Sequence, residues 1–321
     1  MKKPLVSICC TTFNHEAFVK DTLESFVMQE TNFEYEILIH DDASTDNTQE
    51  ILRAYQKTYP GLFNLILQSE NQYSKGAKPF LKYLFPKAQG KYIAMCEGDD
   101  YWTDPLKLQK QVDFLEANPE YIVTYHDFFG IHNLETERKK SPLLDSDKTD
   151  TTAEDLMLNR KFIKTLTLCF RNVITEFPEE MSYVKNGDTF LISLLGNYGK
   201  GKWMGDSIEP GVYRVHDGGV WSLMNSKQRR LNLIITNYWL FQYYSRIGKL
   251  EISKAWYNNL VEFVGLAEKE ALSLNRSKFE LYREQERELM MLKNSLPYKL
   301  GRSLTAPLRF VKAKLHNNVK G

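Results

Sequence analysis

The sequence predicts an α/β fold, in which a mostly parallel central sheet has helices on both faces and is followed by a helical C-terminal region. Through the first 125 residues, short apolar runs alternate with segments whose apolar residues recur at helical spacing. Polar clusters follow three of these runs, as expected where ligands bind beyond the carboxyl ends of parallel strands. At 321 residues, 42% of them hydrophobic, the chain can bury a large core.

The strands are predicted from compact apolar runs, the first of which is rich in β-branched residues. "LVSICCTTF" is the first, and "YEILIHDD", "FNLILQ", "KYIAMC" and "YIVTYH" follow it. They occupy residues 5–13, 35–42, 63–68, 91–96 and 121–126. Because helical segments alternate with these runs, their order favours a parallel sheet.

The helices are predicted from apolar spacing and from the residues that begin or end them. The first is expected at 15–29, and the second at 45–59, where a Pro-Gly pair ends it. The third begins with Asp104 as its cap and Pro105 as its first residue. From residue 227 onward the pattern is almost purely helical.

The charge distribution is uneven although the net charge is only +1. Residues 227–321 have 18 Lys and Arg against 8 Asp and Glu, so the preceding residues are acidic overall. Four scattered cysteines lack the spacing of a disulfide framework or a zinc site, which favours a reducing cytoplasm. The N-terminal apolar run is too short for a signal peptide, and no run of about 18 apolar residues predicts a membrane-spanning helix.

Glu97, Asp99 and Asp100 follow the fourth apolar run. Clustered carboxylates repel one another and lose solvation when buried, so we expect a positive partner or bulk water beside them. A divalent cation on a substrate diphosphate needs only one or two such carboxylates from the protein. The alternatives are neutralisation by arginines and a solvated acidic turn.

Asp41 and Asp42 end the second predicted strand, where a carboxylate is suited to accept hydrogen bonds from a uracil N3–H or a ribose hydroxyl. Thr11 and Asn14, at the end of the neighbouring strand, are expected to contact the same nucleoside. The alternative for these residues is turn and capping chemistry. The full phosphate-loop motif Gly-x-x-x-x-Gly-Lys-Ser/Thr and the Gly-x-Gly-x-x-Gly fingerprint are both absent.

Three segments resemble the N-terminal blocks of family 2 glycosyltransferases, in that family's order and at its spacing. They are "PLVSICCTTFNHEAFVKDTLESFVMQ", "YEILIHDDASTDNTQEIL" and "GKYIAMCEGDDYWTDPLKLQKQVDFLEANPE". The resemblance is strong over residues 4–125 and weaker to residue 222, and the tail matches no widely shared part of the family. It implies a GT-A fold, an inverting transfer from a nucleotide-diphosphate sugar that we expect to be UDP-linked, and Mn²⁺ or Mg²⁺ as cofactor.

By position, Thr11 and Asp42 resemble the family residues that hold the base and the ribose, with Asp41 beside them. Residues 97–100 occupy the place of the family's Asp-x-Asp signature, although the first acid here is Glu. The resemblance implies that Asp99 meets the ribose or the metal and that Asp100 is the direct metal ligand.

Asp188 begins the apolar helical run of "VKNGDTFLISLL", where the helix dipole favours a carboxylate. Its position corresponds to the family's catalytic aspartate, which takes the proton of the acceptor hydroxyl, although Gly187 stands where the family often has Glu. The alternative is a plain N-cap.

The segment "YRVHDGGVWS" supplies two further candidates. His216 is expected to complete the metal shell or to contact the diphosphate, and Arg214 is expected to neutralise phosphate charge. We interpret His15, His40 and His126 as structural, because they share no metal-ligand spacing.

We expect three regions: a nucleotide-sugar-binding half at 1–125, an acceptor-binding half with the base at 126–225, and a helical region at 226–321. From Lys293 to Gly321 there are seven Lys or Arg and no acid, with leucines at helical spacing. This basic amphipathic tail is typical of a helix that contacts an anionic membrane surface. The alternative is a helix that packs on the acidic front of the same chain.

We therefore expect a metal-dependent inverting glycosyltransferase for cell-surface polysaccharide or glycolipid synthesis, acting on a saccharide or lipid-linked saccharide. We expect it in the cytoplasm or at the inner face of the cell membrane, with no nucleic-acid partner, because the acidic front would repel phosphate. The alternatives are a nucleotidyltransferase with a similar sheet and a non-catalytic protein that binds nucleotide sugars or acts as a membrane scaffold.

Overall fold

The computed structural model describes residues 3–132, 139, 141, 143–219, 224–272 and 287. The chain divides into two compact units, residues 1–263 and 264–321. In the second unit, the described residues are helical. The basic tail that the sequence assigns to a membrane surface, residues 293–321, lies outside the described residues. The three regions expected from the sequence stay a prediction, and both of their internal boundaries fall within the first unit.

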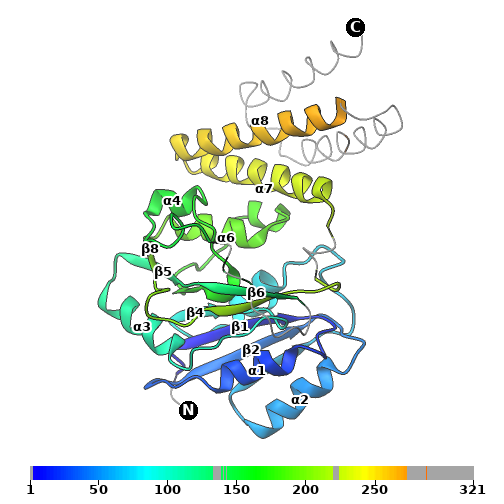
Figure 1. Cartoon of the computed structure of the whole chain (residues 1–321), viewed down its shortest axis with the longest axis vertical. Coiled ribbons are helices and arrows are strands. Elements are labelled where there is room, and N and C mark those ends of the chain that lie inside the picture. The colour runs from blue at the N-terminus through cyan, green and yellow to red at the C-terminus, as the bar shows by residue number, and fades with distance from the viewer. Residues whose placement is uncertain are drawn as a thin grey trace. The chain divides into compact units, whose positions relative to one another are not determined.

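A seven-stranded sheet forms the centre of the first unit (Figure 1). Its strand order is β3-β2-β1-β4-β7-β5-β8. The first four strands of this order are parallel to one another, β7 is antiparallel to both of its neighbours, and β8 is parallel to β5. The strands are β1 (Val6–Thr12), β2 (Tyr35–Asp41), β3 (Phe63–Leu67), β4 (Tyr92–Met95), β5 (Tyr121–Tyr125), β7 (Cys169–Arg171) and β8 (Lys200–Trp203). The prediction of a mostly parallel sheet is confirmed.

A second sheet of two parallel strands, β6 (Phe128–His132) and β9 (Gly211–Val215), completes the strand arrangement. Between Tyr101 and Val212, two backbone hydrogen bonds of 2.8 and 3.1 Å join β9 to the chain that follows the acidic turn. The C-terminal part of the unit is thereby connected to the turn that carries Asp99 and Asp100.

The longer helices lie where helical spacing predicts them. They are α1 (Val19–Val27), α2 (Thr48–Thr58), α3 (Lys107–Ala117), α6 (Gly187–Leu195), α7 (Ser226–Arg246) and α8 (Leu250–Leu272). Two short helices, α4 (Ala153–Met157) and α5 (Glu180–Tyr183), lie in segments for which the sequence predicts no helix. Figure 1 shows α1 and α2 beside each other along β1 and β2. The helix α3 begins later than its predicted cap, because Asp104 first forms a turn in which its Oδ1 accepts the amide of Leu106 at 2.8 Å.

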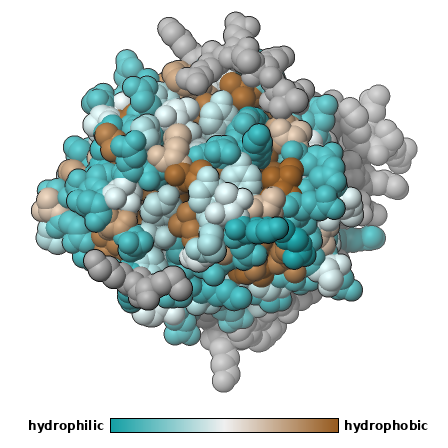
Figure 2. Space-filling model, turned by 90° about the horizontal axis from the view of Figure 1, so that it is seen from below, coloured by the Kyte–Doolittle hydropathy of each residue, from teal (hydrophilic) through white to brown (hydrophobic). Residues whose placement is uncertain are grey.

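The core lies between β1, β2 and β4 and the helices that cover them. Alternate residues of β1 are buried against Leu23 and Phe26 of α1, as the two-residue period of a strand requires. The four cysteines are buried and form no disulfide. Burial raises the pKa of each of their thiols. On the face that Figure 2 shows, hydrophilic residues predominate and hydrophobic residues appear in small groups.

The core also contains a lysine. Lys107 of α3 is fully buried, its Nζ donates to Oε1 of Gln111 at 2.7 Å, and Nζ lies 4.1 Å from the ring centroid of Trp102. Burial lowers the pKa of Lys107 to about 8, although Cys169 and Cys96 act in the opposite direction. The charged form of this side chain therefore costs stability at neutral pH.

We expect Lys107→Met to be more stable relative to the wild type at pH 7.0 than at pH 9.5. Because the folded-state pKa lies below the unfolded value, the unfolded chain binds more protons between pH 8 and 10.5, and wild-type stability rises there relative to the variant. The difference in unfolding free energy between Lys107→Met and the wild type should shrink by about 2 kcal/mol from pH 7.0 to pH 9.5. Denaturant unfolding of both proteins at both pH values measures it, and a pH-independent difference would contradict the assignment.

Candidate active site

Three polar loops meet at the carboxyl ends of β1, β2 and β4. The amide of Asp42 donates to the carbonyl of Thr12 at 3.0 Å, and the amide of Gly98 donates to the carbonyl of Thr11 at 2.8 Å. The loops after the three strands are thus hydrogen-bonded to one another. The polar clusters that follow three of the predicted strands therefore lie together at one edge of the sheet, which we call the rim.

A side chain of α1 is hydrogen-bonded to the backbone of the acidic turn of residues 97–100. Oγ1 of Thr22 donates to the carbonyl of Gly98 at 3.0 Å or to that of Asp100 at 2.7 Å. Position 98 requires glycine, because a Cβ there would lie 2.8 Å from Cβ of Thr12 and 3.1 Å from Nδ1 of His15. The turn therefore packs directly against the end of β1.

Arg214 of β9 holds the same turn from the other side. Its guanidinium is buried, donates to the carbonyl of Asp99 at 3.0 Å and forms an ion pair with Asp21 of α1. Its backbone amide donates to Oδ1 of Asp100 at 2.8 Å. This geometry makes Arg214 a positioning residue for the turn, and the contact with phosphate stays a prediction.

Asp100, expected to be the direct metal ligand, is almost completely buried. Burial raises the pKa of its carboxyl well above the usual range, and the charges of Asp99 and Glu97 act in the same direction. The amide of Arg214 acts against them. Its Oδ1 is thus directed to the backbone of β9, and the role of Asp100 as a metal ligand stays a prediction.

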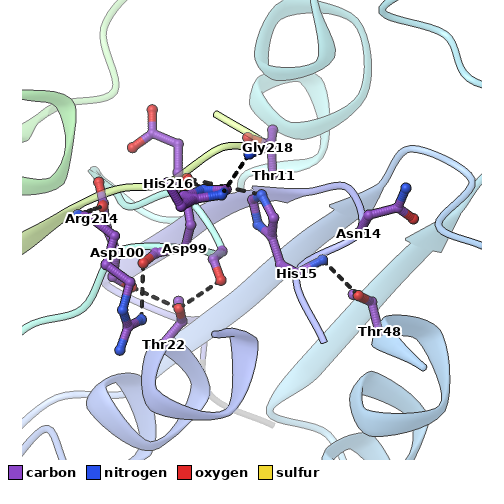
Figure 3. Close-up of polar contacts among 12 residues, drawn as sticks. Thr11, Asn14, His15, Thr22, Thr48, Asp99, Asp100, Arg214, His216 and Gly218 are labelled. Atoms are coloured by element: carbon purple, nitrogen blue, oxygen red, sulfur yellow. Dashed lines mark hydrogen bonds and ion pairs between the residues drawn. The ribbon is translucent and has the colours of Figure 1, made fainter. Parts of the chain in front are cut away.

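Asp99 instead lies with two histidines. Nε2 of His216 is 3.0 Å from Oδ2 of Asp99, and Nε2 of His15 is 3.9 Å from the same oxygen. Figure 3 shows the three side chains directed toward one another, with Thr22 and Arg214 close to the same turn. One ligand atom from each residue lies within 4.8 Å of the other two, so the group is suited to hold a metal ion.

The protonation of this group fits metal binding. Burial lowers the pKa of His15 and favours the neutral imidazole, which is the form that binds metals. Nδ1 of His15 is buried without a hydrogen-bond partner. Burial acts to raise the pKa of Asp99, but the hydrogen bond from His216 and the nearby imidazoles outweigh it, so the pKa is lowered and the carboxylate is ionised.

The interpretation of His15 as structural is therefore revised. His15 belongs to the loop after β1, which bends over the acidic turn, and its amide is fixed by Oγ1 of Thr48 at 2.9 Å. The sequence could have indicated a role for His15 only through its place in the polar cluster after β1. Its spacing along the chain relates it to neither Asp99 nor His216. Thr22 and Asp21 were missed for the same reason.

Asp188 lies in the first turn of α6, is exposed, and accepts the amide of Thr189 at 2.7 Å. Burial raises the pKa of Glu97, and the charges of Asp99 and Asp188 raise it further. The pKa of Tyr213 on β9 is also raised, mainly by burial and by the charge of Asp100. The charges of Asp99 and Asp188 make smaller contributions in the same direction. Asp188 is thus close enough to the acidic turn to act on its ionisation.

The start of α6 is fixed by α7. Oγ1 of Thr236 accepts the amide of Asn186 at 3.2 Å. Glu180 of α5, which precedes α6 in the chain, binds Arg246 of α7 through both carboxylate oxygens, at 2.6 and 2.9 Å. These contacts hold the segment that leads into Asp188.

On the other side of the rim, the aspartates after β2 bind the protein itself. Asp42 accepts the amides of Gln72 and Tyr73 at 2.7 and 2.9 Å. Asp41 accepts the amide of Ser44 at 3.0 Å.

Asn14 and Thr11 complete the strand-end residues expected to contact the nucleoside. Asn14 has a φ of 55°, and its Oδ1 accepts the amide of Thr45 at 2.8 Å. Thr11 is half-buried at the end of β1. Asn14 therefore helps to shape the loop after β2, and contact of these residues with a nucleoside stays a prediction.

We expect Thr22→Val to reduce the free energy of unfolding by about 1–3 kcal/mol, because the carbonyls of Gly98 and Asp100 lose their buried donor. Denaturant unfolding measures the change. Thr58→Val is the matched control, because its hydroxyl also donates to a carbonyl, that of Ala54, but on the surface. The control should stay within about 0.5 kcal/mol. Equal losses in both variants would mean that Thr22 does not hold the turn.

Two curated relatives illustrate the sequence similarity. An uncharacterized protein of Mycobacterium tuberculosis (strain ATCC 25618 / H37Rv) is 34% identical over 225 residues, which cover 70% of this chain and 63% of that protein. The Escherichia coli protein WfaP, named as a UDP-Glc:alpha-D-GlcNAc-diphosphoundecaprenol beta-1,3-glucosyltransferase, is 32% identical over 39% of this chain and 46% of its own. The match thus spans less than two thirds of either relative.

Two solved structures share the fold. Staphylococcus aureus TarS 1-349 in complex with UDP-GlcNAc has a TM-score of 0.53 at 21% identity and covers 81% of this chain and 80% of its own. The mannosyltransferase PcManGT from Pyrobaculum calidifontis, in complex with GDP-Man and Mn²⁺, has a TM-score of 0.53 at 17% identity and covers 99% and 88%. These likenesses support the GT-A architecture expected from the sequence.

The sequence model of glycosyl transferase family 2 matches residues 7–176, which include β1, β2, β4 and the acidic turn. That range is more than half of the chain. The expected family is confirmed: the chain belongs to glycosyl transferase family 2.

Proposed function

We propose that this glycosyltransferase is a metal-dependent inverting enzyme that moves a sugar from a UDP-linked donor to a hydroxyl of a saccharide or lipid-linked saccharide. The observation that carries the proposal is the group formed by Asp99, His216 and His15 at the rim, with the charge of Asp188 acting on the same acidic turn. A role in cell-surface polysaccharide or glycolipid synthesis belongs to this proposal.

The relatives support the donor and metal classes. The name of WfaP gives a UDP-linked donor and a diphospholipid-linked acceptor for that protein. TarS is in complex with UDP-GlcNAc, and PcManGT is in complex with GDP-Man and Mn²⁺. We extend to this chain a UDP-linked donor and a divalent cation, Mn²⁺ or Mg²⁺.

We assign the metal to Asp99, His216 and His15. A carboxylate and neutral imidazoles suit Mn²⁺, and a metal would give the half-buried Asp99 the positive partner that its acidic neighbours cannot provide. When bound, the ion would offset the charge that develops on the leaving diphosphate. Asp100 keeps the turn in place through the amide of Arg214.

The nucleoside part of the donor belongs, in this proposal, to the rim around β1 and β2. Asp41, Asp42, Thr11 and Asn14 surround the ends of these strands. The base or ribose would add a hydrogen bond to carboxylates that already hold the loops at Ser44 and Gln72. Donor recognition and loop order are thus coupled.

Inversion needs one displacement at the anomeric carbon, in which the acceptor oxygen attacks opposite the leaving diphosphate and gives up its proton. Asp188 accepts this proton as general base. Its exposure leaves the carboxylate accessible to an acceptor. Two other acids near α5 have partners, since Glu180 binds Arg246 and Glu179 accepts the hydroxyl of Tyr183 at 2.7 Å.

Contact of the basic tail with an anionic membrane surface would bring the enzyme to a lipid-linked acceptor. In the part of the chain that the structure describes, no helix is both long and apolar enough to cross a membrane. Peripheral binding through the charges of residues 293–321 is therefore part of the proposal.

We expect Asp99→Asn to lose the gain in UDP affinity that Mn²⁺ gives, by at least about tenfold, because a ligand oxygen is replaced by a neutral amide. Asp100→Asn should keep most of the gain, since its Oδ1 can still accept the amide of Arg214. Calorimetry with UDP, with and without Mn²⁺, compares the two variants. Loss of the gain in Asp100→Asn alone would return the ligand role to Asp100.

We expect Asp188→Asn to bind UDP and Mn²⁺ normally but to release UDP from its donor at least ~100-fold more slowly, since Asn cannot take the proton. The rate is measured with water as acceptor, after a panel of nucleotide sugars has identified the donor. Asp206→Asn is the matched control on an exposed acid. Near wild-type rates for Asp188→Asn would reduce Asp188 to a helix cap, for which Asn serves equally well.

A further inference from the structure

Lys164 lies between two aromatic rings near the candidate active site. Its Nζ is 3.8 Å from the ring centroid of Tyr213 and 5.5 Å from that of Phe162. Among the described residues, this ammonium has no hydrogen bond and no ion pair within 4 Å. Its three N–H donors therefore remain available to a ligand.

The loop that carries Lys164 borders Asp188. Nδ2 of Asn159 donates to the carbonyl of Thr189, directly after Asp188, at 2.9 Å. At the other end of the loop, Lys164 contacts Tyr213 of β9, and the amide of the next residue, Arg214, donates to Oδ1 of Asp100 at 2.8 Å. The loop therefore connects the start of α6 to the strand that holds the acidic turn.

Phe162 gives this place an apolar surface. Its side chain is 49% exposed, although its ring packs at 6.1 Å from that of Phe128, which in turn lies 6.1 Å from Tyr213. Its amide is fixed by Oδ1 of Asp147 at 3.2 Å. An exposed ring held in this way is suited to pack against the C–H face of a sugar.

The ammonium of Lys164 and the ring of Phe162 together favour a ligand that has both a negative charge and an apolar face. An ammonium beside an exposed ring can bind an anionic substituent of the same sugar that packs on the ring. If Lys164 served only to neutralise the acidic turn, an ion pair with Glu97 or Asp100 would be expected, and none is formed within 4 Å.

We propose that Phe162, Lys164 and Tyr213 form an acceptor subsite for a sugar that carries a phosphate or carboxylate group, next to Asp188. The inference rests on the proposed function, in which Asp188 is the base. Lys164 binds the anionic group, Phe162 packs on the sugar ring, and Tyr213 supports the ammonium.

The test uses the full chain saturated with UDP and Mn²⁺. Glucose 1-phosphate and glucuronate are the anionic probes, and glucose is the neutral one, with binding followed by ligand-observed NMR. Lys164→Met, which keeps the aliphatic stem, should weaken binding of an anionic probe about tenfold or more and leave glucose unaffected. Phe162→Ala should weaken both classes of probe, and Lys164→Arg should retain anion binding.

Lys200→Met is the matched control, because Lys200 is also beside a tyrosine ring, 5.7 Å from the centroid of Tyr121, at the start of β8. It should bind all probes as the wild type does. Unchanged anion binding in Lys164→Met, or no anion binding by the wild type, would overturn the subsite. A loss of UDP affinity in Lys164→Met would assign the ammonium to the donor diphosphate and also overturn it. Failure of the proposed function would appear separately, as normal donor turnover in Asp188→Asn.

Discussion

The burial of carboxylates in the turn of residues 97–100 is the constraint on which the site depends. Such groups are tolerated in an interior only when hydrogen bonds or positive charge offset the loss of water. The carboxylate of Asp100 accepts a hydrogen bond from the amide of Arg214, and that of Asp99 is hydrogen-bonded to His216. The helix α1 on one side of the turn and the strand β9 on the other are thus needed to keep the acids together. A cation would complete their neutralisation.

The same constraint joins distant parts of the chain. Arg214 and Asp100 are separated by 114 positions, and His216 and Asp99 by 117. The first five strands can therefore build the rim, but they cannot by themselves offset its charges. The second sheet supplies the missing donors, and α7 fixes Asn186 just ahead of Asp188. The polar strand ends and the segment that carries Asp188 consequently depend on one packed unit.

The sequence predicted the sheet and the meeting of its polar strand ends, because alternating apolar runs and parallel strands leave little freedom in where those ends lie. It could not assign partners within the rim. The charge of Arg214 suits a phosphate and a carboxylate equally, and only the fold brings Asp21 to it. Likewise, His15 has no spacing that relates it to Asp99, since the loop after β1 determines their approach.

The four buried cysteines have a practical consequence. Burial raises the pKa of each thiol, so the reactive thiolate is scarce and no sulfur is accessible to a reagent. A cysteine introduced at an exposed position such as Leu144 would then be modified selectively in the folded protein without removal of the native ones. A fluorophore attached there would report on the folded protein while the residues of the rim stay unaltered.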